Sequence, residues 1–421
     1  LKFLGFLDPS FKKGLSRVWD RVPRSFFYLA IRQKIWYNGE DEKEVAVLST
    51  LGLYLHIPFC RSKCLYCDFC SFPHPTGERM EAYAAALCRE LGVRAGDCRG
   101  YTVDTVYFGG GTPTCLPAAT LCRILDAVRT CYRVAEDAEI TAECNPGTVT
   151  AAELSALRRG GFNRLSIGLQ SAQPGELRAL GRLHDFPTFA ETFAAARAAG
   201  FDNLSADVMF GIPHQTPESF ADTLEKLCAL RPDHVSAYAL TVEDGTPFGR
   251  RGAATLELPD EDAVREMYLS MVAFLRGRGI LQYEISNFSR PGYESRHNLK
   301  YWRMEEYLGF GVAAYSDFAG ARFGNSRDVD AYLAGADITA EREIPTARTR
   351  ESERVMLGMR LTEGVPAPVL GAARCARLDH LIPPGLVRRA GECYALTPQG
   401  MLVSNGILSD LVDFSEDPLV K

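Results

Sequence analysis

The chain has 421 residues, a formal net charge of −6 and a pI near 5.8, with 46% apolar and 24% charged residues. This composition is typical of a folded globular protein and excludes a largely disordered chain. The acidic balance gives no general attraction to nucleic acid, so we expect no nucleic-acid partner. The sequence has no continuous run of about 18 apolar residues, which excludes a membrane-spanning helix.

Residues 1–48 form a basic N-terminal extension in which aromatic residues are interleaved. Such a stretch could lie on an anionic membrane surface or cover the folded domain that follows. The simpler interpretation, which we favour, is a poorly ordered extension with at most a peripheral membrane contact. Because it lacks a compact apolar core ending in a cleavage site, we expect a cytoplasmic protein.

Six short runs rich in β-branched or aromatic residues follow, and each ends in a polar or glycine-rich turn. These expected strands lie near residues 52–58, 104–111, 138–146, 163–171, 202–211 and 233–240. Segments with apolar residues three or four positions apart lie between them, as in 78–95 and 186–200, and predict helices. Six strand-then-helix units predict an α/β fold of parallel strands, either a partial barrel or a doubly wound sheet.

The unusual residues of the sequence follow the ends of these expected strands. Cysteines come after the first strand and "GGGTPT" after the second, and polar residues end the next three. Those polar residues are Glu143 and Asn145, then Gln170, then Asp207. Ligands bind at the carboxyl ends of the strands in both candidate architectures, so this edge is the predicted functional site.

The stretch "HIPFCRSKCLYCDFC" contains Cys60, Cys64 and Cys67 in the spacing C-x3-C-x2-C, followed by Cys70. Soft thiolates at this spacing suit zinc or an iron–sulfur cluster. Zinc normally takes four ligands, and no second cysteine pair follows. Three cysteines on one loop would instead leave one iron of a 4Fe-4S cluster open to a chelating cofactor. The alternative is a chance run of core cysteines. We interpret the nine scattered cysteines as core or surface thiols in a reducing cytosol.

A series of motifs in fixed order carries a family resemblance: "YLHIPFCRSKCLYC", "YFGGGTPT", "ECNPGTV", "RLSIGLQS", "LGRLH" and "ADVMFGIPHQT". From about residue 50 to about residue 412 the chain resembles the radical S-adenosylmethionine (SAM) superfamily, in its oxygen-independent coproporphyrinogen III oxidase-like family. This resemblance implies a partial (β/α)6 TIM-like barrel over 49–290. It further implies a barrel-extending region over 291–347 and a small, mainly helical, winged-helix-like C-terminal domain over 348–421.

The resemblance also implies the cofactors and the residues that hold them. Cys60, Cys64 and Cys67 would hold the 4Fe-4S cluster, and SAM would chelate the open iron, where an electron can cleave its sulfonium. The residues that match the family's SAM contacts are Tyr54, Tyr66, Gly110, Gly111, Thr112, Glu143, Gln170, Arg182 and Asp207. Taken singly, each also has a plain structural interpretation, such as a turn glycine or a surface arginine.

Two features separate the branches of this family. The oxidases have a fourth cysteine two positions after the third, whereas this chain has "CDFC". The "CDF" step resembles the haem chaperone (HemW) branch, and we therefore expect Cys70 to be a spare thiol.

The second feature is "HNLKYW", which matches the HNxxYW signature of that branch and implies haem binding by His297, Asn298, Tyr301 and Trp302. A histidine beside aromatic residues is otherwise a common core arrangement. After "GFGVAA" this chain has Tyr315, where we expect a histidine in many relatives.

Two function classes stay open. The first is a haem chaperone that holds a 4Fe-4S cluster, SAM and haem and passes haem to an acceptor protein. The second is a radical SAM enzyme that acts on a tetrapyrrole by decarboxylation or methyl transfer. "CDF" and "HNLKYW" favour the chaperone and argue against a coproporphyrinogen III oxidase, whereas an intact SAM pocket permits chemistry. In either class, the resemblance implies an electron donor such as a flavodoxin or ferredoxin.

Overall fold

Six parallel strands form the centre of the molecule in this computed structural model, which describes residues 49–412. The expected N-terminal extension lies outside the described residues. The six strands are β1 (Ser49–Ile57), β4 (Tyr101–Gly110), β5 (Val134–Cys144), β6 (Arg164–Gln170), β7 (Asn203–Phe210) and β8 (His234–Ala239). All six predicted strands are confirmed. They are hydrogen-bonded in sequence order, without the reversal of order that defines a doubly wound sheet, so the architecture is the partial barrel.

Further strands extend this sheet on both sides to twelve in the order β14-β13-β12-β11-β1-β4-β5-β6-β7-β8-β10-β9. Strand β11 pairs in parallel with β1, and β10 pairs in antiparallel fashion with β8. Their bounds are β9 Leu281–Glu284, β10 Asn287–Ser289, β11 Tyr307–Phe310, β12 Tyr315–Phe318, β13 Ala321–Asn325 and β14 Thr339–Glu343. The extension beyond β1 comes from residues far along the chain, and the sequence pattern did not predict its pairing.

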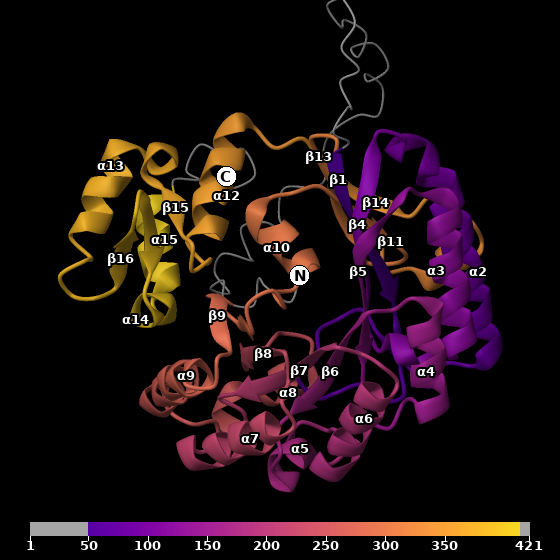
Figure 1. The fold of residues 1–421 in the computed structure, drawn as a ribbon, viewed down its shortest axis with the longest axis horizontal. Helices are drawn as coiled ribbons and strands as arrows, with labels where there is room; N and C mark the ends of the chain where they lie inside the picture. Colours follow the sequence, from indigo (N-terminus) through magenta and orange to yellow (C-terminus); the bar gives the residue numbers. More distant parts are fainter. Residues whose placement is uncertain (1–48, 413–421) are drawn as a thin grey trace, which may run out of the picture.

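Helices cover the outer side of the curved sheet, and α10 lies on its inner side (Figure 1). The outer helices are α2 (Gly77–Arg94), α3 (Ala118–Cys131), α4 (Ala151–Gly160), α5 (Pro174–Ala179), α6 (Phe186–Ala198), α7 (Pro217–Ala229) and α9 (Glu261–Arg276). Shorter elements are α8 (Pro247–Arg251), α10 (Arg296–Arg303), α11 (Val329–Leu333) and the 3-10 turns Ala95–Cys98, Pro113–Cys115 and Ala253–Thr255. Many helices start at a side-chain cap; Thr150 and Thr216, for example, each complete a capping box.

Residues that alternate along the strands separate the apolar core from a polar lumen. Leu51, Leu53 and Leu55 of β1 and Leu165 and Ile167 of β6 are fully buried in the main apolar core. Burying each such side chain stabilises the fold by roughly 1.5–3 kcal/mol. The alternate positions of the same strands are mostly polar and, by the period of two, face the opposite side. The apolar contacts that stabilise the barrel therefore lie on the outer face of the sheet, and the inner face carries polar side chains.

The C-terminal part packs beside the barrel and contains a second, three-stranded sheet in the order β15-β17-β16 (Figure 1). Its elements are α12 (Ala347–Gly358), β15 (Val365–Pro366), α13 (Ala367–Asp379), β16 (Val387–Ala390), β17 (Cys393–Leu396), α14 (Pro398–Leu402) and α15 (Ser404–Leu411). These elements are mainly helical and include one β-hairpin, formed by β16 and β17. This part contacts the barrel edge where Thr362 N donates to Tyr283 O at 3.0 Å and Gln282 Nε2 lies 3.1 Å from Met401 Sδ.

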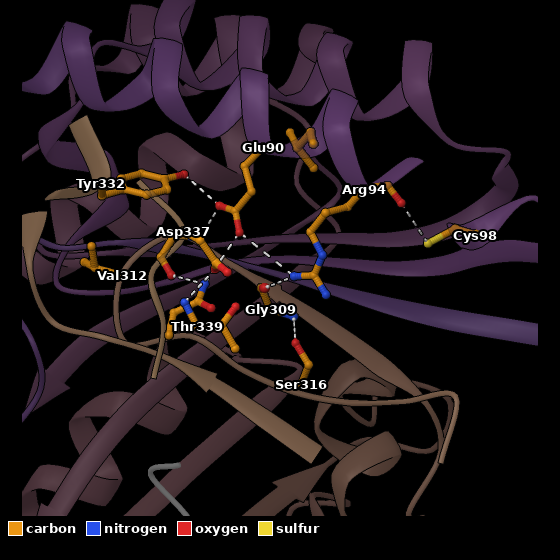
Figure 2. A network of polar contacts seen from close by, with 12 residues as sticks. Glu90, Arg94, Cys98, Gly309, Val312, Ser316, Tyr332, Asp337 and Thr339 are labelled. Carbon is orange, nitrogen blue, oxygen red and sulfur yellow. Dashed lines mark hydrogen bonds and ion pairs between the residues drawn. The ribbon is translucent and has the colours of Figure 1, made fainter. Parts of the chain in front are cut away.

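A buried polar network fixes the sheet extension to the outer helix α2. Figure 2 shows Glu90 of α2 accepting hydrogen bonds from the Tyr332 hydroxyl at 2.7 Å, and the same carboxylate accepts from Gly311 N at 2.8 Å. Arg94, one turn later, donates to Gly309 O at 3.1 Å and lies over the ring of Phe310. Burial raises the pKa of Glu90. These contacts hold the end of β11 against the barrel, next to the end of β1.

Candidate functional site

The polar inner face of the barrel forms the candidate site. Residues that are paired in register on neighbouring strands point to the same side, so rows of side chains cross the lumen from strand to strand. One row runs from Tyr54 through Tyr107 and Thr141 to Arg164. A second row runs from Glu143 through Ser166 to Ser205 of β7. The lumen thus carries hydroxyl, carboxylate and guanidinium groups where many barrels are packed with apolar side chains.

The cysteine loop leaves β1 at the carboxyl edge of the barrel. Short strands β2 (Phe59–Cys60) and β3 (Phe72–Pro73) pair at its base and close it. Within the loop, Cys67 N donates to Cys64 O at 3.3 Å, and Lys63 Nζ donates to Phe69 O at 3.1 Å. A loop closed in this way presents its cysteines together rather than along an extended strand.

The donor set of this loop fits an iron–sulfur cluster. Cys60 is buried, while Cys64 and Cys67 are half-buried. Burial raises the pKa of the Cys67 thiol to about 11, and neighbouring thiols add to this shift, so a metal that binds this sulfur has to displace its proton. Within residues 49–412 no three His, Cys, Asp or Glu side chains are grouped to hold one metal ion. A cluster binds each thiolate through a different iron, so its ligands need not converge on one point.

His56 of β1 ties the cysteine loop to the barrel. Its Nε2 donates to the backbone carbonyl of Cys70 at 2.9 Å, and its Nδ1 lies 3.1 Å from the Tyr54 hydroxyl. Since a carbonyl only accepts, Nε2 carries the proton and Nδ1 accepts from Tyr54. Burial lowers the pKa of His56 to about 4, so the ring is neutral at pH 7. Cys70 itself is 8% exposed and belongs to the apolar core.

The glycines after β4 allow close approach of two backbone segments. A Cβ on Gly110 would lie 2.5 Å from the His56 ring, and one on Gly111 would lie 2.6 Å from the Phe59 carbonyl oxygen. The N–H groups here already have acceptors, because Gly110 donates to Glu143, Gly111 to Ile57 and Thr112 to Phe59. Any ligand contact at this turn must therefore use other atoms than these three N–H groups.

Arg182 links the cysteine loop to β6 and to the residue that follows β5. Its Nη1 lies 3.4 Å from Cys64 Sγ, and its Nη2 donates to Asn145 Oδ1 at 2.7 Å and to Gly168 O at 3.1 Å. Asn145 Nδ2 in turn donates to Thr112 Oγ1 at 2.7 Å, and that oxygen lies 3.5 Å from Cys60 Sγ. This chain joins two of the three predicted cluster ligands to two of the predicted SAM contacts.

Two carboxylates line the same edge, and each has a defined partner. The Tyr107 hydroxyl donates to Glu143 Oε1 at 3.0 Å, and the Ser166 hydroxyl donates to Asp207 Oδ1 at 2.8 Å. In the strand register Glu143 is level with Ser166 and Ser205, and Asp207 is level with Gly168, so Asp207 lies two residues nearer the carboxyl edge than Glu143. Carboxylates so placed attract a cationic ligand such as a sulfonium or an amine.

Gln170 and the two predicted tyrosines complete the set. Gln170 has a φ of 63°, a left-handed conformation that non-glycine residues rarely adopt and that concentrates at functional sites. Its Oε1 is buried and has no hydrogen-bond partner within residues 49–412. Tyr54 faces the lumen, stacked with Tyr107 at 6.2 Å between ring centroids. Tyr66 packs against a small apolar cluster that contains Leu180 and Phe248.

The "HNLKYW" segment forms helix α10, which starts on the lumen floor. Glu139 of β5 accepts from the backbone N–H of Arg296 and of His297, at 3.0 and 3.1 Å. The His297 ring hydrogen-bonds Thr105 Oγ1 and the Tyr301 hydroxyl, each at 2.8 Å, and stacks on Tyr107 at 5.2 Å. The predicted haem residues therefore adjoin the row of tyrosines that leads to Glu143.

In this conformation His297 is enclosed. The side chain is 1% exposed, and both ring nitrogens are hydrogen-bonded. Burial, assisted by the Lys300 charge, lowers the pKa of His297 to about 3. Asn298 and Trp302 are also buried. Iron ligation by His297 would therefore require α10 to move or its hydroxyl partners to turn away.

Several residues that shape this site were not predicted. His56, Tyr107 and Ser166 each bond a predicted site residue, and Arg164 faces the lumen from the first position of β6. The signal that could have found them is the alternation itself, because a polar residue at every second position of a buried strand marks an inner polar face. Separately, no helix within residues 49–412 is long and apolar enough to cross a membrane.

Comparison with known proteins gives one consistent result. The model of the radical SAM superfamily matches residues 54–227. The protein named heme chaperone HemW from Mycobacterium tuberculosis is 35% identical over 368 residues, which cover 86% of this chain and 94% of that relative. The protein of the same name from Escherichia coli is 34% identical over 373 residues, covering 86% and 98%.

Among solved structures, the coproporphyrinogen III oxidase HemN of Escherichia coli, described as a radical SAM enzyme, superposes with a TM-score of 0.75. The two chains are 25% identical, and the match covers 88% of this chain and 92% of that one. The partial barrel, the small C-terminal part and the near-full-length similarity to these relatives all indicate the same family. The chain belongs to the radical SAM superfamily, to its HemN-like family and, within that family, to the HemW branch.

Proposed function

We propose that this protein is a haem chaperone that binds a 4Fe-4S cluster, SAM and haem and transfers haem to an acceptor protein. The observation that carries the proposal is the near-full-length similarity to proteins named heme chaperone HemW. The placement of "HNLKYW" beside the lumen tyrosines supports it. We further propose a cytoplasmic location and an electron donor of the flavodoxin or ferredoxin type.

The proposed cofactor site uses the carboxyl edge of the barrel. Cys60, Cys64 and Cys67 would hold the cluster, which with bound SAM supplies an electron able to cleave the sulfonium. Arg182 would orient the cluster loop and attract a carboxylate, since its guanidinium already bridges Cys64 and Asn145. The remaining SAM contacts we propose are Tyr54, Tyr66, Gly110, Gly111, Thr112, Glu143, Gln170 and Asp207.

The proposed haem site uses helix α10. His297 would provide an imidazole, and Tyr301 and Trp302 flat rings, with Asn298 as a polar neighbour. Because His297 and Trp302 are buried here, haem binding would require the helix to open, and closing it again would favour release. A helix that exchanges its internal contacts for contacts to haem suits a carrier better than a permanent haem protein.

A second candidate is a radical SAM enzyme that acts on a tetrapyrrole. The similarity to HemN over most of both chains favours it. An oxidase must bind coproporphyrinogen III near the cluster and turn it over, whereas a chaperone binds haem and does not change it. The two candidates therefore differ in product rather than in cofactor.

The deciding experiment uses the full chain, reconstituted anaerobically with iron and sulfide. Haemin titration should show about one haem per chain, with weaker binding in His297→Ala and in Trp302→Ala and unchanged cluster absorption. His380→Ala, a histidine of the C-terminal part, serves as the matched control. Coproporphyrinogen III with SAM and reductant should give no protoporphyrinogen IX. Steady formation of protoporphyrinogen IX, or an unaltered haem affinity in both α10 variants, would contradict the chaperone proposal and favour the enzyme.

A further inference from the structure

The floor of the lumen contains a buried cation that the cofactor site does not use. Arg164, the first residue of β6, is 1% exposed and is the largest fully buried side chain of the described residues. Its Nε and Nη1 have no hydrogen-bond partner, and no ion pair joins it to a carboxylate within residues 49–412. A guanidinium removed from water without partners costs several kcal/mol.

The lumen carboxylates of residues 49–412 accept hydrogen bonds from groups other than Arg164. Both oxygens of Glu139 accept from the first N–H groups of α10. Glu143 accepts from Tyr107 and Gly110, and Asp207 Oδ1 accepts from Ser166. Each lumen carboxylate thus has donors of its own, so the protein supplies the arginine with long-range charge but not with an acceptor in hydrogen-bonding contact.

The side chain beside Arg164 has the same property. Thr141 of β5 is paired in register with Arg164, so the two side chains share one face on neighbouring strands, roughly 5 Å apart in backbone position. The Thr141 hydroxyl is 0% exposed and has no hydrogen-bond partner within residues 49–412. Two adjacent buried donors without acceptors indicate a place for an acceptor that the protein itself does not provide.

We propose that Arg164 and Thr141 form a carboxylate-binding subsite on the lumen floor. A guanidinium offers two parallel N–H groups that match the two oxygens of a carboxylate, and a hydroxyl can donate a third hydrogen bond. On the proposed function, on which this step rests, the carboxylate is a propionate of the bound tetrapyrrole.

The position of the subsite agrees with this ligand. Tyr107, on which His297 stacks, is paired in register with Thr141, so α10 and Arg164 flank the same row of the lumen. Burial lowers the pKa of His297 and of His234, which lies on β8, and the Arg164 charge adds to both shifts. A flat ligand held at α10 would therefore have a carboxylate receptor on the facing strands.

The first test needs no haem. Propionate and its neutral analogue propionamide are each added to the full chain, and thermal unfolding is followed. Propionate should raise the melting temperature of the wild type but not that of Arg164→Gln, and propionamide should raise neither. Arg360→Gln is the matched control, since Arg360 is a buried arginine outside the lumen. Equal responses to the two compounds, or the same propionate response in Arg164→Gln, would overturn the subsite.

The second test compares haemin with its dimethyl ester, in which both propionates are blocked. Arg164→Gln should weaken haemin binding about tenfold to a hundredfold, as for the loss of a charge-assisted hydrogen bond, and leave ester binding unchanged. Arg164→Lys should recover part of the loss. If Arg164→Gln weakens the binding of haemin and of the ester equally, Arg164 has only a structural role. If the wild type binds neither ligand, the proposed function fails, and the propionate test alone decides the subsite.

Discussion

The Nε2 atom of His56 lies 2.9 Å from the carbonyl oxygen of Cys70, so the last lumen-facing side chain of β1 holds the far end of the cysteine loop. The loop is fixed through the backbone of Cys70 rather than through its thiol. The first prediction depends on this distinction between the backbone and the thiol of Cys70.

The first prediction concerns the cysteines. Changing Cys60, Cys64 or Cys67 to Ala should remove the visible absorption of the reconstituted cluster, because each change removes one thiolate ligand. Cys70→Ala should keep the absorption, since its backbone carbonyl still accepts from His56. Iron and sulfide contents per chain provide the measurement. Loss of the cluster in Cys70→Ala, with the three other variants intact, would contradict this assignment.

The second prediction concerns SAM. Adding SAM to the reduced cluster should alter its electron paramagnetic resonance signal. In Asp207→Asn, about tenfold more SAM should be needed for the same change of the signal, as for one lost charge-assisted contact. Asp202→Asn, an exposed change just before the same strand, is the control and should behave as the wild type. An unaltered signal in the wild type at saturating SAM would mean that SAM does not reach the cluster.

The third prediction concerns the network of Figure 2. Glu90→Ala should lower the free energy of unfolding by about 2–3 kcal/mol, because it leaves the Tyr332 hydroxyl and Gly311 N buried without their acceptor. Amide hydrogen exchange should rise around Gly311. Glu81→Ala on the same helix removes an exposed ion pair to Arg123 and should cost under about 1 kcal/mol. Equal losses in the two variants would argue against the network.

The fourth prediction concerns pH. Burial raises the pKa of Glu284 from 4.5 to about 7, so the folded protein binds a proton there that the unfolded chain releases. This term makes the free energy of unfolding fall as pH rises from about 4.5 to about 7, by at most roughly 3 kcal/mol. Glu284→Gln should remove the term.

The measurement is chemical denaturation between pH 5 and 7, comparing slopes rather than absolute stability. His297 opposes Glu284 in this range, since a pKa lowered to about 3 makes stability rise with pH up to about 6.5. The free energy of unfolding of Glu284→Gln should therefore rise more steeply with pH than that of the wild type. Parallel curves would show that Glu284 does not titrate between these limits.

The sequence predicted what is local. Runs of β-branched and aromatic residues ending in polar or glycine-rich turns identified all six barrel strands, and the spacing of Cys60, Cys64 and Cys67 identified the cysteine loop. Glycine positions also carried information, since Gly110 and Gly111 occur where a Cβ would meet His56 or Phe59. In each case the physical cause acts over a few residues, so it leaves a readable pattern.

Contacts between distant segments could not be predicted. His297 meets Thr105 and Tyr107 only because α10 returns to the lumen floor, and no local pattern encodes that return. The Glu90 contact with Gly311 likewise depends on β11 pairing with β1. The polar partners of a motif are thus set by topology, while the motif itself is set by spacing.

The position of β1 has a consequence for synthesis of the chain. Gly52 pairs with Thr105 of β4 on one side and with Tyr307 of β11 on the other. The first partner is made roughly 50 residues later and the second roughly 250, which at about 5–20 residues per second separates them by roughly 10–40 s. During that interval one edge of β1 is unpaired while the rest of the barrel is being translated. Pairing with another nascent chain then competes with pairing to β11.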